Sequence, residues 1–282
     1  MNGSKYFRVC KIIIFCLILS CSRSGTFYPF YFVQVSDPQI GMTTIEQDSI
    51  NFSRAVQLIA QLEPAFTVIT GDFVHHADSI REWNVFEYIL KQIPRRAYLV
   101  PGNHDFGNNL NNESLASYRK KFGDDYYTVN RQSCLFVMLN SQYFINDTLP
   151  EAKKQEQWLE DALNPFWRKP VHKFVFMHIP LYTEKPDEPD KYENIPIKHR
   201  QILLEKFTKT NVDYVITGHS HYNHKHKYEN LNLVSTASTS NIIGEQAYTL
   251  GLGFNIFEVF KDTVKFEYCE LDNPVQNVIL KR

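Results

Sequence analysis

The sequence predicts an α/β fold in which two β-sheets pack face to face and helices cover the outside. Up to residue 217, apolar strand-like runs alternate with amphipathic helical segments. From residue 222 onward the segments are mostly strand-like. With 282 residues and 43% hydrophobic content, the chain can bury one sizeable core in a single domain of about 250 residues.

The amino-terminal half contains short β-rich runs that end at Gly, Pro, Asn or Asp, separated by segments with apolar residues at helical spacing. A strand, a helix and a second strand in this order form a βαβ unit, and the pattern then repeats. The predicted elements are strand 30–35, helix 51–62, strand 66–70, helix 83–93 and strand 97–100. The aromatic residues 27–32 are interpreted as the start of the first strand and not as a membrane contact.

The rest of the chain continues with helices and strands in mixed order. The predicted elements are helix 114–122, strands 126–130 and 135–140, helix 151–163, strand 173–177, helix 197–209 and strands 214–217, 231–235, 254–259 and 263–269. Between them, residues 180–196 are rich in Pro, Asp, Glu and Lys. We expect an exposed loop there, and loops on a rigid sheet commonly contact substrates.

The amino terminus has the features of an export signal. Lys5, Arg8 and Lys11 accompany the apolar residues 12–19, a stretch too short to span a membrane as a helix. The stretch ends in Ile-Leu-Ser-Cys, which resembles the processing site of bacterial lipoproteins. We therefore expect a signal peptide at residues 1–20, lipidation at Cys21, a tether at 21–28 and one domain at 29–282.

This prediction implies an exported protein, held by its lipid on a membrane, or secreted if it is not lipidated. Removing residues 1–20 takes away three cations and no anions, so the formal charge changes from −1 to −4. A basic surface for nucleic acid is therefore not expected. The mature chain would keep Cys134 and Cys269, which lie in apolar runs and are predicted to be buried thiols and not a disulfide.

Five short polar clusters, each directly after a strand-like run, contain the candidate functional residues of the sequence. They are Asp37-Pro38-Gln39, Gly71-Asp72, Gly102-Asn103-His104-Asp105, Met177-His178 and Gly218-His219-Ser220-His221. Each cluster alone is compatible with an ordinary turn or helix cap. Together they offer carboxylates, an amide and imidazoles, which are ligands suited to Zn, Mn or Fe more than to Ca or Mg.

In this order the clusters resemble the motifs of the calcineurin-like metallophosphoesterases: DxH, GDxx, GNH followed by an acid, a His, and GHxH. The resemblance implies a four-layer αββα sandwich of two mixed β-sheets, and a dinuclear centre at the strand ends that hydrolyses phosphoesters with a metal-bound hydroxide. The two divalent ions would be Mn, Fe or Zn. The first would be bound by Asp37, Gln39, Asp72 and His221. The second would be bound by Asp72, Asn103, His178 and His219.

The same resemblance implies that His104 contacts the phosphate or protonates the leaving oxygen, and that Asp105 orients its ring. Two positions depart from the family pattern. Gln39 stands where the first motif has His, so an amide replaces an imidazole. His75 stands where purple acid phosphatases have the Tyr that binds ferric iron. The further imidazoles of His76, His224 and His226 are expected to face solvent.

The Asp-Pro-Gln first motif resembles a smaller branch of the family that includes an animal serine/threonine phosphatase. This favours a phosphomonoesterase acting on a protein or a small molecule. The alternatives are a phosphodiesterase acting on nucleotides or lipid head groups, and a non-catalytic scaffold with the same fold. A scaffold would not need the complete set of site residues.

Overall fold

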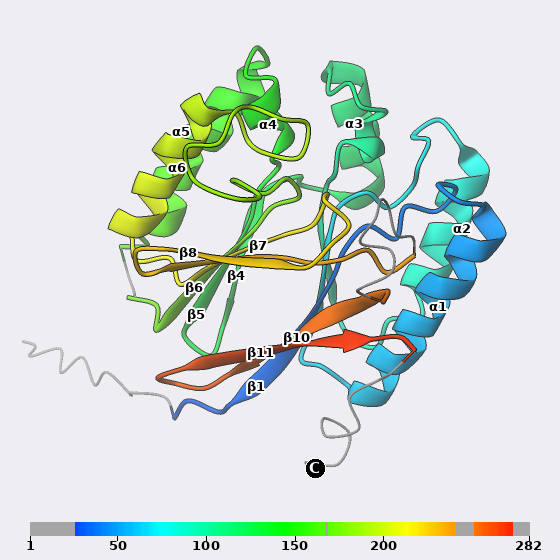
Figure 1. Ribbon diagram of the computed structural model, residues 1–282, viewed down its shortest axis with the longest axis horizontal. Coiled ribbons are helices and arrows are strands. Elements are labelled where there is room, and N and C mark those ends of the chain that lie inside the picture. The colour runs from blue at the N-terminus through cyan, green and yellow to red at the C-terminus, as the bar shows by residue number, and fades with distance from the viewer. Residues whose placement is uncertain (1–25, 167–168, 241–250, 273–282) are drawn as a thin grey trace, which may run out of the picture.

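The computed structural model describes residues 26–166, 169–240 and 251–272, which fold into four layers (Figure 1). The predicted signal peptide and Cys21 lie outside the described residues. One layer is a five-stranded mixed sheet. Its strands are, in spatial order, β11 (Val264–Glu270), β10 (Gly253–Val259), β1 (Phe30–Val35), β2 (Thr67–Thr70) and β3 (Ala97–Val100).

The second sheet has six strands and is also mixed. Its order is β4 (Tyr127–Arg131), β5 (Cys134–Met138), β6 (His172–Phe176), β7 (Tyr214–Thr217), β9 (Leu231–Ser235) and β8 (His224–Tyr228). In the first sheet β1, β2 and β3 are parallel, and in the second β5, β6, β7 and β9 are parallel. The predicted two-sheet α/β sandwich is confirmed.

Helices cover the outer face of each sheet (Figure 1). Those packed on the first sheet are α1 (Ile45–Leu62), α2 (Ile80–Leu90) and α3 (Asn112–Phe122), the last preceded by the 3₁₀ turn η1 (His104–Phe106). Those on the second sheet are α4 (Gln142–Ile145), α5 (Pro150–Leu163) and α6 (Ile197–Lys209). Within the described ranges, no helix is long and apolar enough to cross a membrane.

Both faces of the central strands are apolar, because each sheet is buried on both sides. In β1, Phe32 points between the sheets, whereas Val33 and Val35 pack toward the helices. In β5, Phe136 points between the sheets and Val137 toward the helices. The alternation of side chains along a strand thus divides the apolar residues into three separate clusters.

The layer between the sheets is built from aromatic rings. Phe32 stacks on Phe66 and on Phe257, with ring centroids 5.1 and 4.9 Å apart, and Phe136 stacks on Phe174 at 5.0 Å. Phe32 also meets Phe136 edge-on at 5.7 Å. Flat rings in offset and edge-on contact pack two sheets at a fixed separation. The first strand therefore lies in the core, as its aromatic sequence predicted.

The predicted thiols are also confirmed: Cys134 and Cys269 are buried, and neither forms a disulfide within the described part of the chain. Burial raises the pKa of Cys134 to about 12, so that thiol is protonated at neutral pH.

Helix α1 begins six residues earlier than the sequence predicted, at Ile45 instead of residue 51. Thr44 caps it, with its hydroxyl accepting a hydrogen bond from the Gln47 N–H at 3.0 Å. Asp48 is buried although it lies in the first turns, because its carboxylate accepts the N–H groups of Gly41 and Thr43. These polar positions concealed the amino-terminal end of the helix.

Strand β8 was not predicted, and neither was the single turn of α4. The β8 segment reads His-Lys-His-Lys-Tyr and lacks the apolar run from which the other strands were predicted. It forms a hairpin with β9 and lies at the edge of its sheet, where charged side chains are tolerated because one side faces solvent.

Truncation of Phe32 tests the aromatic layer. Phe32→Ala should destabilise the protein by about 3–5 kcal/mol, because the side chain is fully buried and leaves a cavity. Urea unfolding measures the loss. Tyr28→Ala, a change of a neighbouring residue that is 64% exposed, should cost less than about 0.5 kcal/mol. Equal losses in the two variants would contradict the proposed packing.

Candidate metal centre

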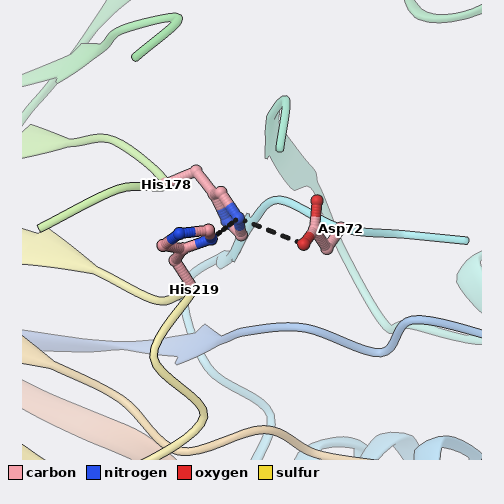
Figure 2. Close-up of side chains that lie close together, drawn as sticks. All are labelled: Asp72, His178 and His219. Atoms are coloured by element: carbon pink, nitrogen blue, oxygen red, sulfur yellow. Dashed lines mark hydrogen bonds and ion pairs between the residues drawn. The ribbon is translucent and has the colours of Figure 1, made fainter. Parts of the chain in front are cut away.

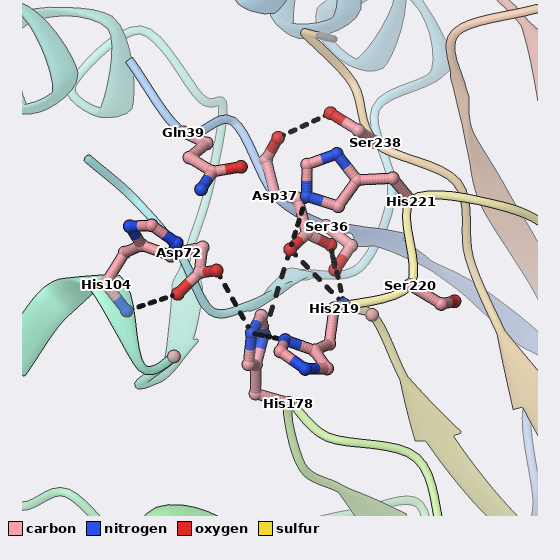
Figure 3. Close-up of polar contacts among 12 residues, drawn as sticks. Ser36, Asp37, Gln39, Asp72, His104, His178, His219, Ser220, His221 and Ser238 are labelled. Atoms are coloured by element: carbon pink, nitrogen blue, oxygen red, sulfur yellow. Dashed lines mark hydrogen bonds and ion pairs between the residues drawn. The ribbon is translucent and has the colours of Figure 1, made fainter. Parts of the chain in front are cut away.

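The polar clusters follow strands that end at the same edge of the sandwich. Asp37 follows β1, Asp72 follows β2 and Asn103 follows β3, while His178 follows β6 and His219 follows β7. In Figure 3 the side chains from both sheets turn toward one another across this edge. The sequence prediction that the clusters meet is therefore borne out for residues as far apart in the chain as Asp37 and His221.

Four side chains form one group of donor atoms. The His178 Nε2 atom lies 3.2 Å from Asp72 Oδ2, 3.1 Å from Asn103 Oδ1 and 3.1 Å from His219 Nδ1. The donor atoms of Asp72, His178 and His219 all lie within 4.8 Å of one another, and the three residues are buried (Figure 2). Such a cluster of lone pairs could hold a metal ion.

Backbone carbonyls determine which imidazole nitrogen faces this group. The His178 Nδ1 atom lies 2.7 Å from the Thr70 carbonyl, to which it donates, so Nε2 carries the lone pair in the neutral ring that binds a metal. His219 is the reverse case, because its Nε2 donates to the Tyr192 carbonyl at 2.9 Å and Nδ1 is left with the lone pair. A second hydrogen bond that fixes the tautomer is typical of metal-binding histidines.

A second group of donors lies around Asp37. Its Oδ2 accepts hydrogen bonds from the Ser36 hydroxyl and from the His219 N–H, at 2.5 and 3.0 Å. Its Oδ1 lies 3.5 Å from His221 Nε2. Gln39 adds an amide to this group, and Figure 3 shows it on the side that faces Asp72. The two groups are thus joined through neighbouring carboxylates.

Gln39 has a specific partner in His75. The Gln39 Nε2 atom donates to His75 Nδ1 at 3.3 Å, which directs the NH₂ end of the amide away from the donor group. The remaining Oε1 atom is buried and has no hydrogen-bond partner among the described residues. The two positions that depart from the family pattern, Gln39 and His75, therefore contact each other.

His104 is oriented by a carbonyl and not by Asp105, so the role predicted for Asp105 is wrong. The His104 Nδ1 atom donates to the His75 carbonyl at 2.9 Å, and the His104 ring stacks on the His75 ring with centroids 4.8 Å apart. The Asp105 carboxylate instead accepts the N–H groups of Phe73 and Gly102, at 2.7 and 2.8 Å. Asp105 thus links the loop after β2 to the loop after β3.

The backbone at the site is strained. Positive φ angles are uncommon outside glycine and cost about 1–3 kcal/mol each. Positive φ values occur at Asp37 (50°), Gln39 (32°), Asp72 (50°), His219 (68°) and His221 (59°). The loops hold the donor side chains inward at the expense of unfavourable backbone conformations, which is common at functional sites.

Glycines allow the loops to approach closely. A Cβ atom at Gly71 would lie 2.5 Å from His178 Nδ1, and Gly71 also has a φ of +90°. A Cβ atom at Gly102 would overlap the Asp72 carboxylate. The glycines of the GD and GN motifs are therefore required because the donor residues pass directly against them.

The buried ionisable groups of the site shift one another's pKa values. Burial alone would raise the pKa of Asp72, but His178 and His104 lower it below its ordinary value. Burial disfavours a charge on His178, but Asp72 outweighs it and raises the pKa of His178 to about 9. Burial, and then the adjacent His178, lower the pKa of His219 to about 4, so that imidazole is neutral. The site concentrates negative charge that favours a cation.

The residues fit divalent metal ions. Buried polar atoms normally have a hydrogen-bond partner, yet Gln39 Oε1 and His221 Nδ1 have none in the part of the chain that the structure describes. Carboxylate, imidazole and amide donors are what borderline divalent cations such as Mn, Zn and Fe bind. An ion placed beside Gln39 would satisfy its orphaned Oε1 atom.

The other imidazoles have structural contacts, so the expectation that they face solvent is wrong for two of them. His224 lies on β8 and its Nε2 is 3.2 Å from the Ser220 hydroxyl. His226 donates to the Thr183 carbonyl at 2.8 Å. His76 is 58% exposed in its side chain and pairs with Glu82 at 2.9 Å.

The sequence analysis missed the carbonyl groups of Thr70, His75 and Tyr192, which accept hydrogen bonds from the site histidines, because no side-chain motif indicates a backbone acceptor.

Comparison with known proteins agrees with this geometry. Residues 30–223 match the calcineurin-like phosphoesterase family. The serine/threonine-protein phosphatase CPPED1 of Bos taurus is 33% identical over 271 residues, which cover 86% of this chain and 84% of that protein. The Homo sapiens protein of the same name is 32% identical over 270 residues, with 86% and 84% covered.

Solved structures share the fold. A purple acid phosphatase from yellow lupin superposes with a TM-score of 0.69 at 14% identity, covering 91% of this chain and 56% of that one. A dimetal phosphatase from Danio rerio superposes with a TM-score of 0.66 at 13% identity, covering 88% and 98%. The family match, the identity to whole relatives and the convergent donor groups lead to one conclusion: this chain belongs to the calcineurin-like phosphoesterases and is a phosphoester hydrolase.

Proposed function

We propose that the protein is a phosphomonoesterase with two divalent ions, acting on phosphorylated serine or threonine side chains or on small phosphate monoesters. The observation that carries the proposal is the pair of adjacent donor groups, one around His178 and Asp72 and one around Asp37. Support for a monoester substrate comes from the relatives, which are named serine/threonine phosphatases and match 86% of the chain. The chain's single Asp-Pro-Gln motif accords with that branch.

The first ion would be held by Asp37, Gln39, Asp72 and His221. The second would be held by Asp72, Asn103, His178 and His219. When bound, two such ions neutralise the charge on the phosphoryl oxygens and activate a water molecule. Asp72 would contribute to both ions. Its two oxygens face different partners, the His104 N–H at 2.9 Å and His178 Nε2 at 3.2 Å.

His104 is the residue proposed to protonate the leaving oxygen. Its Nδ1 is held by the His75 carbonyl, so the ring presents Nε2 as the nitrogen that can meet a substrate. In the imidazolium form, Nε2–H can donate its proton to the departing alkoxide. The backbone N–H of the same residue bonds to Asp72, which fixes the distance between this acid and the ion site.

We also propose that the protein is exported and anchored through a lipid on Cys21. The proposal is supported by the basic and apolar amino-terminal segment and by the position of the described chain. Strand β1 begins at Phe30 and runs toward Asp37, so Phe30 lies at the end of the strand away from the metal centre. An anchored protein would therefore hold its active site away from the bilayer, facing soluble phosphoesters.

Activity and metal content of two variants test the proposed function. The purified chain with added Mn²⁺ should hydrolyse p-nitrophenyl phosphate faster than its bis ester. His104→Ala should reduce kcat by about 10²–10⁴-fold, the usual contribution of a positioned general acid, and should retain its Mn²⁺. Asp72→Asn should lose both activity and Mn²⁺, because it removes the shared charge. An unchanged rate in His104→Ala, or full Mn²⁺ content in Asp72→Asn, would refute the assignment.

The contact between Gln39 and His75 can be tested by a double-mutant cycle. His75→Ala should weaken Mn²⁺ binding at the first ion by about 10-fold, as loss of an outer-shell partner typically does. In a Gln39→His background the same change should have little effect, because an imidazole ligand has no amide to orient. Isothermal titration with Mn²⁺ measures both. Equal losses in the two backgrounds would show that His75 does not act through Gln39.

Lipid anchoring can be tested in a bacterial host supplied with labelled palmitate. The wild-type chain should incorporate the label and partition into detergent, whereas Cys21→Ala should do neither. Cys16→Ala is the matched control and should keep the label, because residue 16 lies inside the predicted signal peptide. Labelling of Cys21→Ala would rule out this cysteine as the lipidation site.

A further inference from the structure

The loop at residues 180–196 is organised around a buried carboxylate. Glu188 is 1% exposed and accepts hydrogen bonds from the N–H groups of Thr183 and Glu184, both at 2.9 Å. It also accepts one from Asn194 Nδ2 at 2.6 Å. Burial alone would raise the pKa of Glu188, but these hydrogen bonds lower it to about 2. The carboxylate is therefore charged at neutral pH, and it accepts hydrogen bonds from several groups of the loop.

A guanidinium group from the following helix donates hydrogen bonds to carbonyl groups of the loop. Arg200 of α6 is fully buried, and its Nε donates to the Ile195 carbonyl at 3.0 Å. Its Nη1 donates to the carbonyls of Pro186 and Glu188 at 3.0 and 2.7 Å. Buried charges with several hydrogen bonds hold a single geometry. Loop 180–196 therefore has a well-defined conformation.

This loop carries Tyr192 to the donor group that contains Asn103 and His219. The Tyr192 carbonyl accepts the His219 Nε2–H at 2.9 Å, and the Tyr192 ring lies 4.7 Å from the His219 ring, measured between centroids. The Tyr192 hydroxyl accepts a hydrogen bond from Asn103 Nδ2 at 2.8 Å. One residue of the loop thus contacts two donor side chains that come from different sheets.

Both contacts select which atom faces the proposed ion. An asparagine amide can turn either its oxygen or its NH₂ group inward, and only the oxygen can ligate a cation. With the NH₂ group bonded to the Tyr192 hydroxyl and to Asn108 Oδ1, Asn103 presents its own Oδ1 toward His178 Nε2 at 3.1 Å. The carbonyl contact likewise leaves Nδ1 of His219 as the nitrogen with the lone pair.

We propose that Tyr192 is a positioning residue of the second metal site, and that its hydroxyl, together with Asn108 Oδ1, holds Asn103 in the orientation that ligates the ion. The inference rests on the proposed two-ion function. It assigns to the loop the task of completing the site, in addition to any contact with the substrate. Tyr192 acts through Asn103 and His219 and does not itself bind the ion.

Removing the hydroxyl is a clean test, because Tyr192 is 64% exposed and its phenol oxygen is not part of the core. The full chain is titrated with Mn²⁺ in a calorimeter, and its melting temperature is measured with and without Mn²⁺. Tyr192→Phe should bind the first equivalent as the wild type does and the second about 10-fold more weakly. Its melting temperature without Mn²⁺ should be unchanged, and the rise caused by Mn²⁺ should be smaller.

Two controls separate orientation from a general effect. Tyr88→Phe removes an equally exposed hydroxyl on α2 and should bind Mn²⁺ normally. In an Asn103→Asp background, Tyr192→Phe should cause little further loss, because the two carboxylate oxygens are equivalent and need no orientation. An equal loss in that background would overturn the proposal.

The remaining outcomes distinguish this inference from the function on which it rests. If the wild type binds two equivalents of Mn²⁺ and Tyr192→Phe binds them equally well, the role of Tyr192 is refuted and the two-ion function stands. If the wild type binds no Mn²⁺, the proposed function falls and the inference falls with it.

Discussion

The buried negative charge of Asp72 is the constraint around which the site is arranged. Its side chain is 2% exposed, so water cannot stabilise the carboxylate and other groups have to do so. The chain supplies the His104 N–H from the same sheet and His178 from the opposite one. A carboxylate that contacts both sheets links them at the edge where the strands end, and its negative charge favours a cation there.

The aromatic layer makes this arrangement rigid. Phe32 and Phe136 hold the sheets at a fixed separation, so the loops that leave them start from fixed points. The loops then enter left-handed backbone conformations, which cost free energy that the packed core has to offset. Donor atoms held this way are already close together before a ligand arrives, and little reorganisation is needed to bind one.

Several contacts around the donor groups concern orientation more than charge. Backbone carbonyls choose the tautomers of His178 and His219, and side chains choose the direction of the two amides, Gln39 and Asn103. The replacement of an imidazole by Gln39 is therefore not an isolated loss, because His75 supplies the partner that an amide needs. Loop 180–196, held by its own Glu188 and by Arg200 of α6, has a similar relation to Asn103 through Tyr192.

The sequence by itself determined the two-sheet fold, most helices and strands, and the residues that meet at the strand ends. These follow from periodicity and from motifs, which are local and therefore visible in the chain. It missed the polar edge strand β8 and the capped start of α1, where polar residues interrupt the pattern. Only the tertiary structure decided that Asp105 ties loops together and that Tyr192 reaches Asn103, because partners distant in the chain satisfy these hydrogen bonds.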